Sequence, residues 1–177
     1  KRLFISFQGA ESGLALWLNG KFVGYSEDSF TPSEFELTEY VKEGENKLAA
    51  QVFKWTASSW CEDQDFYRFS GIYRDVYLYT VPEVHVNDLR IRAIPDVSLA
   101  SADFELTTKT WGKGQLKIVL SKEGNVVLED VKEISDEDTF SWKVDAPVLW
   151  SAEDPQLYDL ELTVSDENGN VQEIIPQ

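Results

Sequence analysis

The stretch LALWLNGKFVGY, residues 14–25, decides the fold class of this chain. Two strand-like runs, Leu14–Leu18 and Lys21–Tyr25, flank the dipeptide Asn19-Gly20. Both residues of this dipeptide tolerate a positive φ, which a two-residue hairpin turn requires. The stretch therefore predicts an antiparallel β-hairpin.

Strand-like runs continue along the rest of the chain. Near the hairpin, Asn46–Trp55 and Ile72–Thr80 alternate as strands do, and Thr38–Val41 predicts one helical turn. Short strands with turns at intervals of about 8–12 residues are typical of antiparallel sandwiches, so the sequence predicts an all-β protein. In the second half the expected strands are Asp103–Trp111, Gln115–Leu120, Val126–Val131, Thr139–Val144 and Leu157–Val164, with turns at 112–114, 123–125, 136–138 and 166–170.

Charge and aromatic side chains are unevenly distributed. The chain of 177 residues carries 32 acidic and 16 basic side chains, for a net charge of -16. Residues 1–94 hold a net charge of only -4 and 17 of the 23 aromatic side chains. Such a shift indicates two domains. The segment Ile94-Pro95-Asp96-Val97-Ser98 interrupts two strand-like runs, which predicts domains at 1–95 and 96–177.

Composition excludes several classes of function. A large negative charge repels nucleic acid and anionic lipid, so neither is expected as a partner. The single cysteine, Cys61, cannot form an internal disulfide. No apolar run approaches the roughly 18 residues that a membrane-spanning helix needs. No signal peptide is visible at the first residues, and a cytoplasmic location is expected.

One segment, Trp55–Gly71, has a composition suited to binding. It places three carboxylates, a glutamine and an arginine among five aromatic residues, and it lacks the periodicity of a strand or helix. Carboxylates and amides can hydrogen-bond sugar hydroxyls, and aromatic faces can pack on the C–H face of a pyranose. A well-packed loop with solvated acids explains the same composition equally well. Both readings stay open on the residues alone.

Catalysis finds little support in the residues. Glycoside hydrolysis usually needs two carboxylates on either side of the scissile bond. Asp63 and Asp65 are two residues apart in one loop, so nothing sets their spacing across a sugar, and no catalytic residue is expected in this chain. His85 lies in an alternating, strand-like stretch, and this pattern predicts a structural role for the histidine. The acidic stretch 166–170 lacks the bidentate glutamate of a calcium loop and predicts a hairpin turn.

The string Glu62-Asp-Gln-Asp-Phe-Tyr-Arg-Phe-Ser-Gly-Ile-Tyr-Arg-Asp-Val76 resembles the end of the first domain of bacterial β-galactosidases of glycoside hydrolase family 2. Other pieces resemble that family in the same order: residues 18–29, 31–37, 43–48 and 147–158. The resemblance covers essentially the whole chain, and it is weakest over 98–144, where only the strand pattern agrees.

This resemblance implies two antiparallel β-sandwiches. Residues 1–95 would be the C-terminal part of a jelly-roll, galactose-binding-like domain, and residues 96–177 an immunoglobulin-like sandwich. The family's catalytic (β/α)8 barrel, which carries both catalytic glutamates, would follow in the same chain beyond Gln177. The chain is then expected to be a non-catalytic N-terminal region of an enzyme that hydrolyses terminal β-D-galactosides such as lactose.

The resemblance also implies one site residue. In the family, the second aspartate of the Glu-Asp-Gln-Asp string contacts galactosyl hydroxyls and a sodium ion, and it matches Asp65 here. Sodium and magnesium are expected for the intact enzyme, and no cofactor for this chain alone. Arg68 and Arg74 match motif positions to which we assign a structural role, pairing with nearby acids. Cys61 and the pair Phe66-Tyr67 depart from the motif without removing the carboxylate.

Two other readings stay open: a stand-alone carbohydrate-binding module and a β-sandwich interaction domain. A truncated jelly roll bares strand edges and apolar surface, which favours self-association. Fold similarity cannot choose among these readings, because both architectures host many functions.

Overall fold

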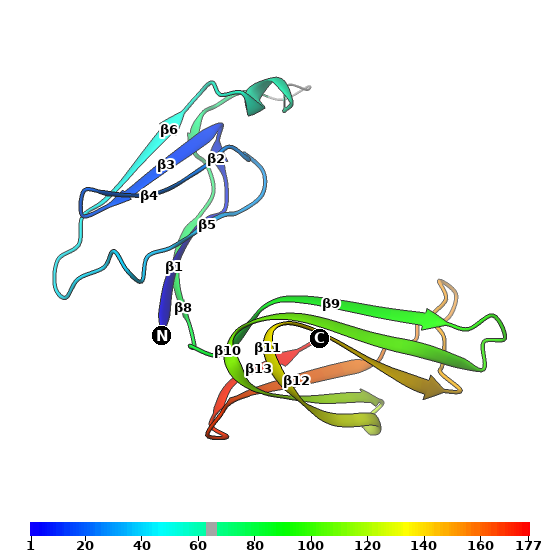
Figure 1. The fold of residues 1–177 in the computed structure, drawn as a ribbon. Coiled ribbons are helices and arrows are strands. Elements are labelled where there is room, and N and C mark those ends of the chain that lie inside the picture. Colours follow the sequence, from blue (N-terminus) through cyan, green and yellow to red (C-terminus); the bar gives the residue numbers. More distant parts are fainter. Residues whose placement is uncertain (63–66) are drawn as a thin grey trace. The chain divides into compact units, whose positions relative to one another are not determined.

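The computed structural model describes residues 1–62 and 67–177, and these form an all-β protein, as predicted. The described residues contain one short 3-10 helix, η1 (Ser58–Trp60), and no α-helix. The chain divides into two compact units, Lys1–Val81 and Pro82–Gln177. Figure 1 follows the strands of each unit in chain order.

The described residues of the first unit form two three-stranded antiparallel sheets and a short two-stranded ladder. The sheets have the orders β5-β1-β8 and β4-β3-β6, and β2 pairs with β7. Buried apolar side chains from the sheets form the core, among them Ile5, Phe7, Leu14 and Leu16. The strands are β1 (Arg2–Phe7), β2 (Ala10–Glu11), β3 (Gly13–Leu18), β4 (Lys21–Ser26), β5 (Ser33–Glu36), β6 (Leu48–Phe53), β7 (Gly71–Ile72) and β8 (Val76–Val81).

The predicted hairpin is confirmed. β3 and β4 pair antiparallel, and Leu18 lies opposite Lys21 across the turn. Asn19 and Gly20 both have positive φ, at 54° and 80°. The strand expected at Ile72–Thr80, in contrast, is interrupted between β7 and β8. Around this break the backbone follows the 8–9 segment, since Gln8 N–H donates to Asp75 O at 3.0 Å and Tyr73 N–H to Gly9 O at 3.2 Å.

The second unit is a sandwich built on two very long strands. β10 pairs with β9 over residues 102–111 and with β12 over residues 114–121, so its two halves belong to different layers. The core between the layers includes Leu106 from one half of β10 and Ile118 from the other, both with no exposed surface. The strands are β9 (His85–Pro95), β10 (Ser101–Lys122), β11 (Asn125–Asp145), β12 (Asp159–Asp166) and β13 (Val171–Pro176).

Two turns expected in this unit are wrong. The segments 112–114 and 136–138 were expected to separate strands, but β10 and β11 continue through them. The β10–β11 ladder resumes after a register shift, in which Thr110 pairs with Asp136 and Lys113 with Ser135. The extra residues form a β-bulge, which bends a strand without ending its pairing. The turn-forming residues in these two segments therefore lie where a continuous strand bends from one layer of the sandwich to the other.

The domain boundary also lies elsewhere than at residues 95 and 96. The structure divides the chain between Val81 and Pro82. The physical reason is β9, which hydrogen-bonds along most of its length to the first half of β10 and therefore belongs to the second unit. The proline at 95 ends this strand at the edge of a sheet, where a missing N–H is tolerated.

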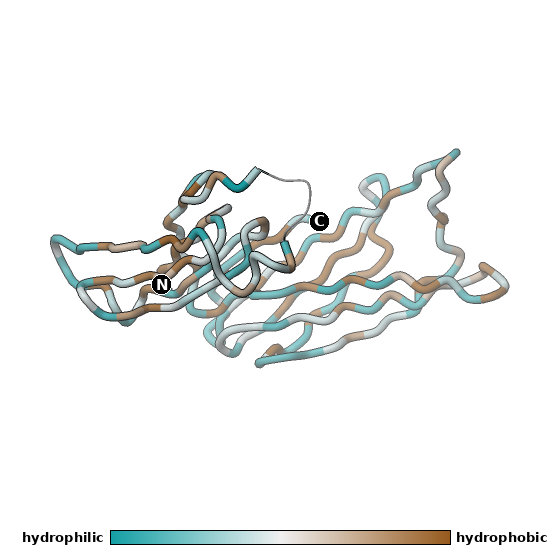
Figure 2. The backbone as a smooth tube through the Cα atoms, turned by 90° about the horizontal axis from the view of Figure 1, so that it is seen from above, coloured by the Kyte–Doolittle hydropathy of each residue, from teal (hydrophilic) through white to brown (hydrophobic). Residues whose placement is uncertain are grey.

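Several local predictions are confirmed in the second unit. The His85 side chain is buried, and its Nδ1 lies 2.8 Å from Pro82 O, as expected of a structural histidine. The stretch 166–170 is the turn between β12 and β13, where Asp166 accepts from the N–H groups of Asn168 and Asn170. Figure 2 shows hydrophilic and hydrophobic residues alternating along the strands, which places one side of each in a core.

Among the described residues, no helix is long and apolar enough to cross a membrane.

Candidate functional site

A cluster of hydroxyl groups anchors the start of the segment Trp55–Gly71, which was singled out in the sequence. Ser12 has no exposed surface, and its Oγ lies 2.7 Å from Thr56 Oγ1 and 2.8 Å from Ser59 Oγ. Ser59 Oγ also accepts from the N–H of Thr56 at 3.0 Å. These bonds satisfy polar groups that would otherwise be buried without partners. They fix η1 against the start of β3.

Glu27 ties the same segment to β4. Its Oε2 accepts from Ser58 N–H at 3.0 Å, and its Oε1 accepts from the Tyr25 hydroxyl at 2.8 Å. The Tyr25 hydrogen bond, followed by that of Ser58, lowers the pKa of the Glu27 carboxyl below its ordinary value. Glu27 is therefore held as a carboxylate acceptor, because hydrogen bonds to the charged form favour it.

Two further carboxylates clamp the chain on either side of residues 63–66. Glu62 accepts from Ser29 N–H at 2.9 Å and from the Ser29 hydroxyl at 2.7 Å. Glu11 accepts from the N–H groups of Phe69 and Ser70, both at 3.1 Å. Ser29 is fully buried, so its N–H depends on Glu62 for a partner. The two clamps hold Glu62 and Phe69–Ser70 against different parts of the first unit.

A hollow of about 450 Å³ is formed by residues of the same segment. It is lined by Trp55, Thr56, Ser59, Trp60 and Arg68. Arg68 donates from Nη2 to Ser59 O at 2.6 Å, and its guanidinium carbon lies 5.0 Å from the centre of the Trp55 ring. Trp60 is 85% exposed and Tyr67 is 84% exposed, which is unusual for such large apolar groups. An arginine that stacks on a tryptophan, next to exposed aromatic side chains, can bind a ring-shaped polar ligand.

Arg74 has the structural role expected of it, but with different partners. Among the described residues it donates from Nη1 to two carbonyl oxygens, Phe30 O at 2.8 Å and Gln8 O at 3.2 Å, instead of pairing with acids. Tyr73 donates its hydroxyl to Ser29 O, and burial raises the pKa of its phenol above the usual value. Arg68 binds the carbonyl of Ser59 among its partners.

The residue to which the sequence assigned a role, Asp65, lies outside the described residues, as do Asp63, Gln64 and Phe66. Of the three carboxylates considered in the sequence, only Glu62 is described, and it is engaged with Ser29. Within 1–62 and 67–177, no three His, Cys, Asp or Glu side chains come together as a metal site.

Sequence reasoning missed the residues that hold this site in place. Ser12 and Glu11 lie more than 40 positions before their partners in the segment, so no local pattern connects them. Ser29 appeared in the resemblance only as part of a hairpin motif. The β2–β7 pairing brings Glu11 beside Phe69 and Ser70, and the β3–β6 pairing, in which Gly13 lies opposite Phe53, brings Ser12 near Thr56 and Ser59.

Two family models match the chain from end to end. Residues 1–82 match the model described as glycosyl hydrolases family 2, sugar binding domain. Residues 84–177 match the model described as glycosyl hydrolases family 2. The change from one model to the other falls next to the division between the two structural units.

Curated relatives share high sequence identity over the whole chain. A protein of Halalkalibacterium halodurans named beta-galactosidase is 52% identical over 99% of this chain and 18% of its own length. Beta-galactosidases of Clostridium acetobutylicum and Streptococcus thermophilus are 48% and 45% identical, over 20% and 18% of their lengths. The chain thus spans about a fifth of the length of these relatives.

Solved structures share the fold at lower identity. An FMN-binding beta-glucuronidase from Facaelibacterium prausnitzii L2-6 superposes with a TM-score of 0.80 at 22% identity, over 99% of this chain and 29% of that one. A Bifidobacterium dentium beta-glucuronidase complexed with coumarin-3-O-glucuronide gives 0.78 at 22% identity, over 99% of this chain and 36% of its own. At this identity the likeness establishes the architecture alone.

Proposed function

This chain belongs to glycosyl hydrolase family 2, and from that premise we propose that it is the non-catalytic N-terminal region of a β-galactosidase acting on terminal β-D-galactosides such as lactose. The identity of 52% to a named beta-galactosidase, extending across both domains, is the observation that carries this proposal. The catalytic glutamates would come from a barrel in the same polypeptide. This region would act as scaffold and supply one carboxylate.

That carboxylate is Asp65 in our proposal. Support comes from the clamps on either side, because Glu62 on Ser29 and Glu11 on Phe69 and Ser70 hold the chain just before and after residues 63–66. A carboxylate can accept hydrogen bonds from two adjacent galactosyl hydroxyls.

Asp65 would also be a ligand of sodium in the full-length enzyme. Hard cations prefer oxygen ligands, which suits a carboxylate. The described residues do not by themselves complete a metal site, so the remaining ligands would come from outside them.

The test uses the full-length enzyme with Asp65→Asn. Losing one charge-assisted hydrogen bond predicts a fall in kcat/KM for a nitrophenyl galactoside of about ten- to hundredfold, together with weaker dependence on sodium. Asp63→Asn changes the same chemistry two residues away and serves as the matched control. Unchanged kinetics and unchanged sodium dependence in Asp65→Asn would overturn the assigned role.

A carbohydrate-binding module is the second candidate, and the hollow beside Trp55 and Trp60 favours it. Exposed aromatic faces next to an arginine are a composition that binds sugar rings. Calorimetric titration of this chain with galactose would decide. Saturable binding that Trp60→Ala removes would favour the module, and absence of heat would leave the scaffold role.

A further inference from the structure

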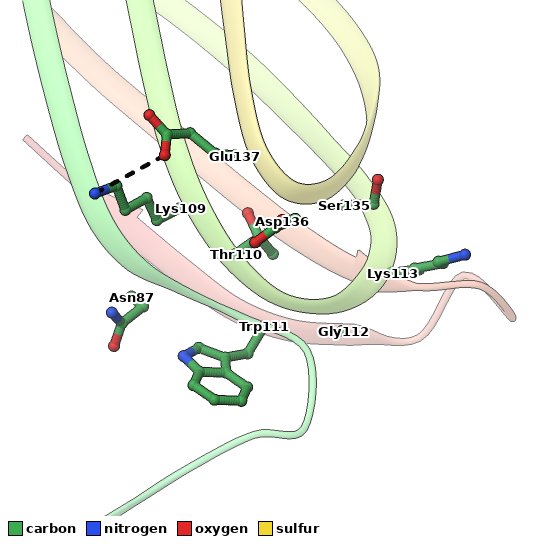
Figure 3. A pocket seen from close by; sticks show the side chains of 9 residues that line it. All are labelled: Asn87, Lys109, Thr110, Trp111, Gly112, Lys113, Ser135, Asp136 and Glu137. Atoms are coloured by element: carbon green, nitrogen blue, oxygen red, sulfur yellow. Dashed lines mark ion pairs between the residues drawn. The ribbon is translucent and has the colours of Figure 1, made fainter.

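A second hollow, of about 570 Å³, lies in the other unit, where β10 and β11 bend between the two layers. Figure 3 shows its lining, with Trp111 and Asn87 on one side and Thr110 and Asp136 side by side at the bend. The volume falls within the range of small-molecule sites. The whole lining belongs to the second unit, Pro82–Gln177.

Three backbone irregularities meet at this hollow. Asn87 is skipped in the β9–β10 ladder, where the register shifts between Lys109 and Thr110. Trp111 and Gly112 are the extra residues of the β10 bulge. Asp136, opposite the bulge, has a φ of 69°, which is uncommon outside glycine. Bulges redirect side chains, and left-handed residues cluster at ligand sites.

Gly112 shows how closely the backbone approaches itself here. Its φ is 80°, and a Cβ at this position would come within 3.0 Å of Glu83 O. Any larger residue would be strained and would push against the 83–84 segment. The local sequence Trp111-Gly112 thus produces an outward-facing indole, 46% exposed, next to a bend that only glycine accommodates.

Three polar side chains of the lining have hydrogen-bonding capacity that no described residue uses. Among the described residues, the Asn87 amide, the Lys113 ammonium and the Asp136 carboxylate make no side-chain hydrogen bond or ion pair. Together they offer donors and acceptors along the lining of the hollow. Lys109 and Glu137 flank them as a pair, with Nζ and Oε2 3.9 Å apart.

The charges of the lining cancel. The lining contains two ammonium groups, Lys109 and Lys113, and two carboxylates, Asp136 and Glu137. A phosphate would meet the carboxylates and a divalent cation would meet the ammonium groups, so either would be opposed. A neutral ring bearing several hydroxyls meets no such opposition. Its hydroxyls match the unused amide, carboxylate and ammonium, and its C–H face matches the exposed indole.

We propose that this hollow is a binding site for a neutral pyranose, with Trp111 as the stacking platform and Asn87, Lys113 and Asp136 as hydrogen-bonding partners. This goes beyond the proposed function, because it gives the second unit a saccharide contact of its own, distant in sequence from residue 65.

The test is an NMR titration of this chain with D-galactose and, separately, D-glucose. We expect saturable shifts of the backbone amides at 109–113 and 135–137 and of the Trp111 indole N–H. Trp111→Ala should weaken the affinity about tenfold or more, as loss of a stacking face predicts. Trp150→Ala removes an indole that is 62% exposed in the same unit but outside the hollow, and should leave the affinity unchanged.

A second variant keeps the test decisive in case Trp111→Ala does not fold. Asp136→Gly removes the carboxylate at a position whose positive φ suits glycine, so the fold is retained while binding weakens. The proposal is overturned if neither sugar shifts these amides, if shifts appear only around residues 55–62 and 67–70, or if both variants bind as well as the unchanged chain. It is also overturned if sodium phosphate or calcium chloride saturates these residues and the sugars do not. None of these outcomes bears on Asp65, whose test is kinetic.

Discussion

Glu62 and Ser29 form a two-point contact, in which the glutamate accepts both the backbone N–H and the hydroxyl of a fully buried serine, at 2.9 and 2.7 Å. The contact joins residues 33 positions apart and holds the chain immediately before residues 63–66. A carboxylate that looks available for chemistry in the sequence is therefore a structural anchor.

Replacing this anchor should loosen the first unit. Glu62→Ala leaves the Ser29 N–H buried without a partner, which predicts a loss of about 1–3 kcal/mol in the free energy of unfolding. Urea denaturation followed by fluorescence measures it. Glu45→Ala, at an exposed position of the same unit, is the control and should change stability little. Equal effects of the two substitutions would show that the contact contributes nothing.

A buried hydroxyl offers a stabilising substitution in the second unit. Thr108 has no exposed surface, and within the described residues its Oγ1 has no hydrogen-bond partner. Thr108→Val replaces the hydroxyl by a methyl group of similar size and should raise stability by about 1 kcal/mol. Thr107→Val is the control, because Thr107 Oγ1 bonds Thr139 Oγ1 at 3.0 Å and should gain nothing. A lower denaturation midpoint for Thr108→Val would refute this prediction.

The interactions of Asp130 predict that part of the protein's stability is lost at acid pH. The Lys132 ammonium at 2.7 Å, and then the Trp142 indole N–H at 2.7 Å, lower the pKa of this carboxyl to about 2. Because the folded pKa lies below the ordinary value, the stabilisation is present above about pH 4 and is lost as pH falls toward 2. An NMR titration of the Asp130 carboxyl measures the pKa directly, and Trp142→Phe should raise it. A value near 4 in the unchanged chain would contradict the assignment.

An exposed edge predicts self-association. β8 is a terminal strand of its sheet, and Leu78 on this strand is 65% exposed. Unpaired strand edges with apolar side chains tend to associate. Size-exclusion chromatography should show concentration-dependent elution, and Leu78→Lys should shift the elution toward the monomer. The control is the matched change Val171→Lys, which lies on the edge strand β13 of the second unit. A monomer at every concentration would remove this prediction.

The chain alone should not hydrolyse a chromogenic galactoside. In the proposed assignment both catalytic glutamates lie in another part of the full-length enzyme. Glycoside hydrolysis usually needs two carboxylates, one on either side of the scissile bond. The measurement is a nitrophenyl galactoside assay on a preparation free of host enzyme. Turnover that follows the purified chain through successive columns would contradict the non-catalytic role.

Much of the fold could be predicted from local sequence. Asn19-Gly20 between two apolar runs determined the hairpin, because the required φ angles are properties of the two residues themselves. The alternation along β10 and β11 likewise predicted strands with one side in a core. The stretch Glu62–Val76 was sufficient to indicate the family, which the two matching family models confirm.

Other features were decided only by the tertiary structure. Gly112 and Asp136 looked like turns, yet each lies in a strand that bends, because pairing with neighbouring strands continues on both sides of the bulge. The boundary was predicted after residue 95 but lies after residue 81, because β9 pairs with β10 and therefore belongs to the second unit. The contact between Glu62 and Ser29 also joins residues far apart in sequence, 33 positions from one another. Local patterns fix backbone angles and the side a residue faces, whereas contacts between residues distant in sequence depend on which strands pair.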